Sequence, residues 1–252
     1  MNIKTTVVSA LCCLMSASVS FAQNSGLATY RRGVQDSPCE QAIPKGHQLN
    51  LDFGQLCKYE GANAKLSPPS DHRVIYFGDS ITELWGAKIP GLKSDDVINR
   101  GISGQTTAQM LVRYRSDVIN LRPRIVHLMM GTNDIAGNTG ATTIARIEDA
   151  ISSMAENAQA KGLRVIVASI LPAKTITWRP EIDPRASIKV INAWMAGYAL
   201  KQGFTFADYY SSLVDADGGF KAALTSDGVH PNEDGYKVMS AVAIDALQRA
   251  NR

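Results

Sequence analysis

The chain has little net charge and no long run of residues of one sign. Its 252 residues carry 26 lysines and arginines against 23 aspartates and glutamates, a formal net charge of +3 at pH 7. Proteins that bind nucleic acids or anionic membranes usually carry a basic run or patch, and no basic run occurs here. The sequence therefore predicts neither kind of partner.

Cysteine is also scarce. Two of the four cysteines, Cys12 and Cys13, lie in the N-terminal apolar stretch, which leaves Cys39 and Cys57 in the rest of the chain. No pair of histidines lies near these two thiols to complete a zinc shell, so we predict no metal and no cofactor. In an oxidising compartment, two thiols 18 positions apart most simply form one disulfide.

No apolar run is long enough to predict a membrane anchor. Lys4 precedes the apolar run Val7–Met15, which is shorter than the roughly 20 residues that span a bilayer. Small residues at Ser20 and Ala22 then mark a cleavage site. We predict that residues 1–22 are a signal peptide and that the mature chain is exported to a periplasm or the medium. The alternative is an uncleaved anchor helix.

Two glycine motifs are missing as well. The first predicted strand ends in Gly-Asp-Ser, so this turn is neither the Gly-x-Ser-x-Gly elbow of α/β-hydrolases nor a Gly-x-Gly-x-x-Gly phosphate loop. The second absence disfavours a nucleotide or flavin binder. No internal repeat or low-complexity tract is visible in the sequence.

From Arg73 onward, predicted strands and helices alternate. This alternation is typical of a parallel sheet with helices on both faces, in which ligands bind beyond the carboxyl ends of the strands. The predicted strands are Val74–Phe77, Val97–Asn99, Ile125–Met130, Val165–Ile170 and Phe204–Ala207. The predicted helices are Thr107–Leu121, Thr143–Lys161, Pro184–Gln202 and Asp234–Arg249.

Residues 23–72 differ from this pattern. They show no clear periodicity and contain several prolines and glycines, with Pro68 and Pro69 near the boundary. We predict an N-terminal extension over 23–72 that packs over the domain and is held by a Cys39–Cys57 disulfide. Residues 73–252 are then one α/β domain.

The turn after the first predicted strand contains a candidate nucleophile. Gly78–Ile81 reads Gly-Asp-Ser-Ile, and Gly78 lets the backbone bend sharply before Ser80. A serine hydroxyl becomes a good nucleophile when a base takes its proton. The alternative is that Ser80 caps a helix that begins near Ile81. The two roles are compatible, because a helix N-terminus supplies N–H groups for a developing anion.

The matching base is predicted near the C-terminus. Asp227 stands three residues before His230, and Pro231 biases the histidine toward an extended backbone. The carboxylate can then accept a hydrogen bond from Nδ1 and fix the tautomer that a general base needs. The other histidines lie in the extension or inside an apolar strand, where a core role is favoured: His47, His72 and His127.

Two further loops supply candidate donors to an oxyanion. Gly104 closes a glycine-containing block, Asn99–Gly104, and can offer its N–H, although glycines after a strand usually serve turn geometry. Asn133, in Gly131–Asp134, can donate its amide without bringing a charge, although an Asx turn is the alternative there. We expect the neighbouring Asp134 to be structural.

Taken in order, these four blocks resemble those of the SGNH hydrolases, the GDSL-type esterases and lipases. The resemblance runs from about Arg73 to the C-terminus, with Ile81 in place of the family's leucine. It implies a flavodoxin-like three-layer α/β/α sandwich with a five-stranded parallel sheet. It also implies a triad of Ser80, His230 and Asp227, and an oxyanion hole formed by Ser80, Gly104 and Asn133.

We therefore expect a serine esterase that hydrolyses short acyl esters, acetyl esters above all, on small molecules or glycans. Aromatic faces beside an esterase site often support sugar rings, and an arginine can bind a carboxylate. The candidate substrate-binding residues are Trp85, Trp178 and Arg179, although both tryptophans can equally pack the rim. No long apolar lid precedes the blocks, which disfavours a triglyceride lipase. The alternatives are a lysophospholipase or acyl-thioesterase and, in another class, a non-catalytic binding domain on a flavodoxin-like scaffold.

Overall fold

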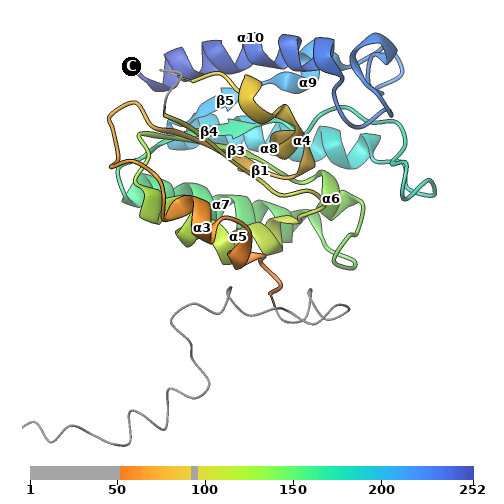
Figure 1. Cartoon of the computed structure of the whole chain (residues 1–252). Helices are drawn as coiled ribbons and strands as arrows, with labels where there is room; N and C mark the ends of the chain where they lie inside the picture. The colour runs from red at the N-terminus through yellow and green to blue at the C-terminus, as the bar shows by residue number, and fades with distance from the viewer. Residues whose placement is uncertain (1–51, 92–95) are drawn as a thin grey trace, which may run out of the picture. The chain divides into compact units, whose positions relative to one another are not determined.

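The computed structural model describes residues 52–91 and 96–252 of the chain. In this part of the chain, one β-sheet lies between two layers of helices (Figure 1). The predicted signal peptide, Cys39 and His47 lie outside the described residues. No helix within the described ranges is long and apolar enough to cross a membrane.

The sheet has five parallel strands in the order β2-β1-β3-β4-β5. The second strand of this order, β1, pairs with β2 on one side, where Val74 faces Val97, and with the central β3 on the other, where Val74 faces Ile125. The strands are β1 (Val74–Gly78), β2 (Val97–Gly101), β3 (Ile125–Met129), β4 (Arg164–Ala168) and β5 (Thr205–Ala207). The predicted five-stranded parallel sheet is confirmed, and each strand end lies within two residues of its predicted place.

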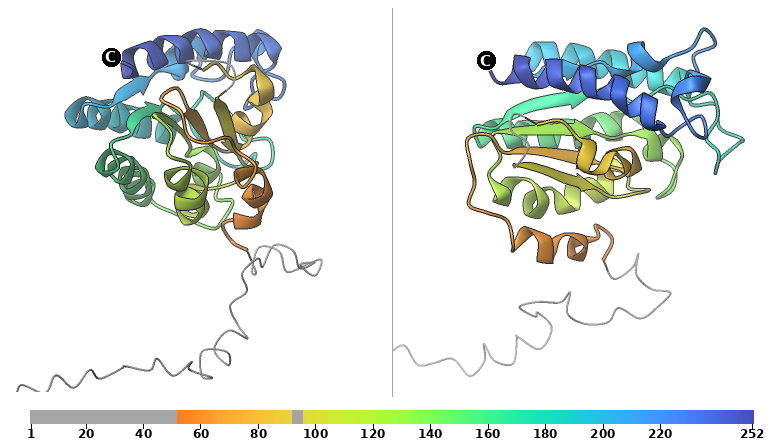
Figure 2. Two further views of the ribbon diagram at one scale, coloured as in Figure 1. Left: turned by 60° about the vertical axis from the view of Figure 1, so that its left-hand side comes forward. Right: turned by 45° about the horizontal axis from the view of Figure 1, so that its top comes forward.

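Helices cover both faces of this sheet. One face packs against α5, α7 and α8, and the other against α4, α9 and α10. The further views show the blue C-terminal helix and the yellow-green helices on opposite sides of the sheet (Figure 2). The predicted three-layer sandwich is therefore confirmed. The helices are α3 (Glu60–Asn63), α4 (Ser80–Trp85), α5 (Thr107–Asp117), α6 (Thr132–Ile135), α7 (Ile144–Ala160), α8 (Arg185–Gln202), α9 (Tyr209–Leu213) and α10 (Glu233–Ala250), with short 3-10 helices η2 (Leu56–Lys58), η3 (Gly86–Lys88), η4 (Ile119–Leu121) and η5 (Ala222–Leu224).

The long helices begin and end at residues suited to those positions. Thr143 caps α7 by accepting a hydrogen bond from Arg146 N at 3.2 Å, and Asn232 caps α10 in the same way. Gly203 ends α8 with φ +71°, a left-handed conformation that glycine adopts without steric cost. Local sequence therefore sets where α7 and α10 begin and where α8 ends.

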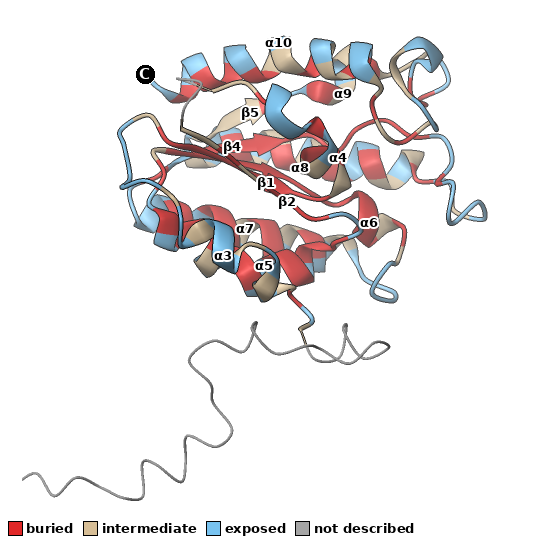
Figure 3. Ribbon diagram, viewed as in Figure 1, coloured by how far each residue is buried: buried red, intermediate tan, exposed pale blue. Residues whose placement is uncertain are grey.

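Alternate side chains of the strands enter two separate cores. In β1, Ile75 and Phe77 belong to the core formed with α5 and α7, whereas Val74 and Tyr76 belong to the core formed with α4 and α10. Because both faces of a parallel sheet are covered, β1 and β3 are buried along their whole length, as the red colour of β1 shows (Figure 3), whereas the edge strands β2 and β5 are partly buried. The candidate site lies at the ends of these strands.

The described end of the predicted extension lies against α5 (Figure 1). Asn63, at the end of α3, donates its amide to Asp117 Oδ1 at 2.9 Å, and Gln109 Nε2 of α5 donates to Phe53 O at 3.0 Å. The predicted disulfide joins Cys57, in η2, to a residue outside the described ranges, so it stays a prediction.

Candidate active site

The strand order places a crevice at the carboxyl ends of β1 and β3. The chain runs from β1 to β2 on one side and then crosses to β3 on the other, a topological switch point at which open α/β sheets bind ligands. Ser80 follows β1, Gly104 follows β2, and Asn133 follows β3 in α6. The predicted site residues of three loops therefore meet at one edge of the sheet.

Ser80, His230 and Asp227 form one hydrogen-bonded chain. Ser80 Oγ lies 2.9 Å from His230 Nε2, although the two residues are 150 positions apart in the sequence. On the other side of the ring, His230 Nδ1 lies 2.8 Å from Asp227 Oδ2. In this arrangement the imidazole can accept the hydroxyl proton while the carboxylate holds the Nδ1–H.

The turn before His230 fixes the orienting carboxylate. Gly228 adopts φ +84°, a conformation that side chains other than glycine rarely tolerate. Asp227 Oδ1 accepts hydrogen bonds from Val229 N at 2.9 Å and from His230 N at 2.7 Å. Partial burial raises the pKa of Asp227, but the hydrogen bonds from the backbone and ring of His230 and from Val229 outweigh it, so its pKa is lowered. The carboxylate is thus held in its ionised form.

Two details around Ser80 differ from the predictions. The cap of α4 is Asp79, whose Oδ1 accepts from Ile81 N at 3.0 Å, so the alternative that Ser80 is the helix cap is wrong. Gly78 serves close packing, because a Cβ at this position would lie 2.7 Å from Met129 O of the neighbouring strand. The glycine therefore lets β1, β3 and α4 approach one another just before Ser80.

Two backbone N–H groups are available for an anion beside the Ser80 hydroxyl. As the first residue of α4, Ser80 has an N–H without an acceptor inside its helix. Gly104 is exposed and adopts φ +78°; the atom nearest to a Cβ placed there would be Asn138 Nδ2, 3.9 Å away. The backbone at Gly104 thus leaves open space that a substrate oxygen can enter.

Asn133 links the loops of the two backbone donors, but its amide is already engaged. Its Nδ2 donates to Asp79 Oδ2 at 3.2 Å and to Gln105 O at 3.1 Å. The side chain therefore joins the residue before Ser80 to the residue after Gly104. To donate to an oxyanion, Asn133 must exchange one of these two bonds.

A buried arginine lies behind these loops. Arg113 of α5 is fully buried and donates to Gln105 Oε1 at 2.5 Å and to Gly78 O at 3.0 Å. It also pairs with Asp117 Oδ2 at 3.1 Å. One guanidinium thus holds both the end of β1 and the residue next to Gly104. We call the connected residues Asp79, Gln105, Arg113, Asp117 and Asn133 the buried network.

Two buried carboxylates near Ser80 have structural partners. Asp134 accepts hydrogen bonds from Thr107 N at 2.9 Å and from Thr107 Oγ1 at 2.6 Å, so the prediction of a structural role is confirmed. Asp79 caps α4 and accepts from Asn133, as described above. Burial raises the pKa of both groups, that of Asp79 to about 6.

Trp85 does not lie in the site. Its side chain is 2% exposed, and its ring packs in the core against three tyrosine rings. The prediction that Trp85 binds substrate is therefore wrong: Trp85 and Ile81 are four positions apart in α4, which puts both on the face toward the sheet. His127 is also a core residue, as predicted; its Nε2 lies 2.8 Å from Tyr209 OH, and burial lowers its pKa to about 3.

Trp178 and Arg179, in contrast, line a pocket beside the catalytic candidates. The Trp178 ring is 39% exposed, and its centroid lies 6.1 Å from that of the His230 ring. The pocket has a volume of about 590 Å³ and is also lined by Gly104. The structure therefore places Trp178 near His230, and Arg179 lines the same pocket as Trp178.

Among the residues of this pocket that are absent from the predictions, two come from the N-terminal extension. These are Phe53 and Gln55. Neither residue belongs to a motif or to a periodic segment, so the sequence offers no signal for them. Only the packing of the extension on α5 brings them beside Gly104.

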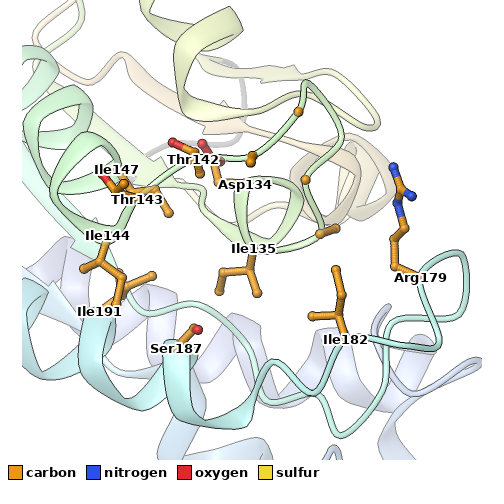
Figure 4. Close-up of a pocket in the computed structure, with 14 residues that line it drawn as sticks. Asp134, Ile135, Thr142, Thr143, Ile144, Ile147, Arg179, Ile182, Ser187 and Ile191 are labelled. Carbon is orange, nitrogen blue, oxygen red and sulfur yellow. The ribbon is translucent and has the colours of Figure 1, made fainter.

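Arg179 also lines a second pocket (Figure 4). Its volume is about 490 Å³, and Ser80 and His230 line neither this pocket nor the first. Isoleucine side chains surround its opening, with Arg179 at the edge (Figure 4). These are Ile135, Ile144, Ile147, Ile182 and Ile191.

Comparison with known proteins agrees with this geometry. The sequence pattern of the GDSL-like lipase/acylhydrolase family matches residues 76–238, which include Ser80 and His230. The chain belongs to this family. As a member of the GDSL-like family it is a carboxylic ester hydrolase, and the resemblance to the SGNH hydrolases is confirmed.

Relatives match between 63% and 80% of this chain. A Bacteroides fragilis protein assigned as an acylhydrolase is 40% identical in sequence, and its crystal structure matches with a TM-score of 0.75 over 80% of this chain and 99% of that chain. A GDSL-like lipase of Bacteroides thetaiotaomicron is 39% identical, with a TM-score of 0.74 over 79% and 99%. Esterase TesA of Pseudomonas aeruginosa is 26% identical over 171 residues, which are 63% of this chain and 79% of TesA.

Proposed function

We propose that this chain is a serine esterase that hydrolyses short acyl esters, acetyl esters above all, with a glycan or a small alcohol as the leaving group. The observation that carries the proposal is the contact between Ser80 Oγ and His230 Nε2 at 2.9 Å, with Asp227 on the far side of the ring. These are the groups and distances that nucleophilic acyl transfer needs.

The proposed reaction has two steps. In the first, Ser80 Oγ attacks the ester carbonyl while His230 Nε2 takes the hydroxyl proton; the carbon–oxygen bond to the alcohol then breaks, and His230 gives its proton to the departing alcohol oxygen. In the second, a water attacks the acyl-enzyme and gives a proton to His230. The acid leaves, and the proton returns to Ser80 Oγ.

The proposed oxyanion hole combines the N–H groups of Ser80 and Gly104 with the Asn133 amide. The two backbone groups are positioned at the ends of β1 and β2 before any substrate binds. We propose that Asn133 joins them by giving up its 3.2 Å bond to Asp79, the longer of its two donor bonds. Preorganised donors of this kind stabilise the charge that develops in the transition state.

A second candidate function is supported by the isoleucine-lined pocket. Five isoleucines line a space of about 490 Å³, together with polar residues such as Thr143 and Ser187, and they offer apolar surface to a longer acyl chain. A preference for such chains would indicate a lysophospholipase or acyl-thioesterase. Rates on p-nitrophenyl esters of increasing chain length distinguish the two candidates: activity that falls steadily beyond acetyl supports the first, and activity that peaks at long chains supports the second.

The test of the serine mechanism is Ser80→Ala. We expect this variant to lose ester hydrolysis by a factor on the order of 10⁴ or more, because no other group replaces the nucleophile. A fluorophosphonate should label the wild type and not the variant, because Ser80 Oγ attacks its phosphorus, a P–O bond forms, and fluoride leaves while His230 takes the hydroxyl proton. The control is Ser153→Ala, which changes an exposed serine of α7. Unchanged turnover in Ser80→Ala would remove Ser80 from the mechanism. A wild type that neither hydrolyses esters nor is labelled would support the non-catalytic alternative.

We also propose that the mature protein is exported and carries the Cys39–Cys57 disulfide. The proposal rests on the N-terminal sequence pattern and on the scarcity of other cysteines. Mass spectrometry of the protein secreted by a host cell should find Gln23 as the first residue and a mass lower than that of the reduced chain by two hydrogen atoms.

A further inference from the structure

The segment Asp52–Lys58 reaches the pocket at Gly104, a candidate oxyanion donor, from outside the region that defines the family. The family pattern begins at residue 76, yet Phe53 and Gln55 line the pocket that also contains Gly104. Phe53 is 42% exposed, so it is not part of the hydrophobic core and can contact a bound molecule in the pocket. A segment that the reaction itself does not require is therefore available to decide which substrate binds.

Hydrogen bonds hold this segment to α5 and to the loop between β2 and α5, residues 102–106, which we call the glycine loop. Gln105 Nε2 donates to Gly54 O at 3.1 Å, and Gln109 Nε2 donates to Phe53 O at 3.0 Å. A Cβ on Gly54 would lie 2.7 Å from Val112 Cγ1, so glycine permits this close approach to α5. The Phe53 backbone is thus fixed relative to Gln105, the residue after Gly104.

The second aromatic side chain of the pocket is held by the same loop. Trp178 Nε1 donates to Asn138 Oδ1 at 2.9 Å, and Asn138 Nδ2 donates to Gly104 O at 3.0 Å. Phe53 and Trp178 come from segments 125 positions apart, but each is tied to a residue at or beside Gly104. Two exposed aromatic rings therefore line one pocket at a fixed place relative to the candidate oxyanion hole.

We propose that Phe53 and Trp178 bind a sugar ring, the alcohol part of the ester, and that Asp52–Lys58 is a specificity-determining segment. This deepens the proposed function and rests on it. Pyranose rings present apolar C–H faces that pack on aromatic rings, while their hydroxyl groups need polar partners. Gln55, Ser103, Asn138 and Arg179 supply such partners around the same pocket. A hydrocarbon chain would offer no hydrogen bond to Gln55 or Arg179 and fits the isoleucine-lined pocket better.

The test compares Phe53→Ala and Trp178→Ala with Leu56→Ala. Leu56 is as exposed as Phe53 and lies in the same segment, but it does not line the pocket. Each variant is assayed on an acetylated oligosaccharide and on p-nitrophenyl acetate, which lacks a sugar. We expect kcat/KM on the oligosaccharide to fall about 10-fold in both ring variants, mainly through KM, because ring packing contributes to binding. On p-nitrophenyl acetate the change should stay within about two-fold, since the reacting groups are unaltered. Leu56→Ala should match the wild type on both substrates.

Three outcomes would overturn the sugar site and leave the serine mechanism intact. The first is a wild type that cleaves p-nitrophenyl acetate through Ser80 but not acetylated oligosaccharides. The second is an equal loss on both substrates in Phe53→Ala, which indicates a structural effect on the glycine loop. The third is no loss on the oligosaccharide in either ring variant. Failure of the proposed function is a different result, namely ester hydrolysis that does not depend on Ser80.

Discussion

The reacting groups and the buried network lie at the same edge of the sheet but differ in exposure. The His230 and Asp227 side chains are 21% and 34% exposed, whereas those of Arg113 and Asp117 are 0% and 1% exposed. Exposed groups can meet a substrate and exchange protons with water. Buried groups make stronger bonds because water does not compete for them, and they cost more when one partner is lost.

The two regions also differ in how many elements they join. The pair His230 and Asp227 comes from a single turn and meets Ser80 through one contact. The buried network connects the end of β1, the glycine loop, α5 and α6. We therefore expect changes in Ser80, His230 or Asp227 to reduce the rate of ester hydrolysis and to leave the free energy of unfolding nearly unchanged. Changes in the buried network should reduce the free energy of unfolding.

Asp227→Asn is expected to have the largest effect, and it falls on the rate. An asparagine keeps the shape but offers an amide where the carboxylate accepts the Nδ1–H, which favours the wrong tautomer of His230. We expect kcat to fall by a factor on the order of 10⁴, as measured for the equivalent change in the chymotrypsin-type triad. Thermal unfolding should shift little, and the exposed Asp71→Asn is the control in both measurements. A large loss of stability would contradict the contrast between the two regions.

Arg113→Met is expected to act on stability first. It removes the guanidinium and leaves the Asp117 carboxylate buried without its charge partner, which should lower the free energy of unfolding by about 3–5 kcal/mol. Urea denaturation measures this, and Arg115→Met, an exposed position of the same helix, should change it by less than about 1 kcal/mol. Adding Asp117→Asn to Arg113→Met should recover part of the loss. An unchanged midpoint in Arg113→Met would show that the buried pair is dispensable.

Asn133 belongs to the buried network and is also a proposed oxyanion donor beside the reacting groups, so Asn133→Ala should affect both regions. The variant removes a proposed oxyanion donor and also the link between Asp79 and Gln105. We expect kcat to fall by roughly 10²–10³, the usual cost of losing one such donor, with KM changed less. Asn120→Ala, an exposed position of η4, is the control. If kcat is retained and only stability falls, Asn133 belongs to the buried network alone.

Asp79→Asn is expected to have the smallest effect, visible as a change in pH dependence. The pKa of Asp79 is raised to about 6, so the folded protein binds more protons than the unfolded chain between about pH 4 and 6. Wild-type stability should therefore fall as the pH rises through this window, by up to about 3 kcal/mol from this group. The difference in unfolding free energy between wild type and Asp79→Asn, measured from pH 4 to 8, should show this slope. The control is Asp149→Asn at an exposed position, for which the same difference should show no slope. A difference curve without slope would mean that Asp79 is not desolvated.

The sequence predicts the scaffold well and the pocket poorly. Strand and helix positions follow from periodicity and capping residues, which are local properties, and the motif spacing singles out Ser80, Asp227 and His230. Trp85 shows the limit of this reasoning: nearness to Ser80 in the sequence suggested a place in the site, but its helix turns the ring into the core. Phe53 shows the converse, a pocket residue in a segment without any pattern.

The sequence by itself determined the five-stranded parallel fold, because apolar periodicity and turn residues act within a few positions of the chain. It also determined the pairing of Asp227 with His230, since three positions and a glycine turn set their distance. Only the tertiary structure decided the bond from Ser80 to His230, the exchange that Asn133 must make, and the pocket between Phe53 and Trp178. These three features depend on how loops from distant segments pack at the carboxyl edge of the sheet. Many weak contacts determine such packing, and no single sequence motif predicts them.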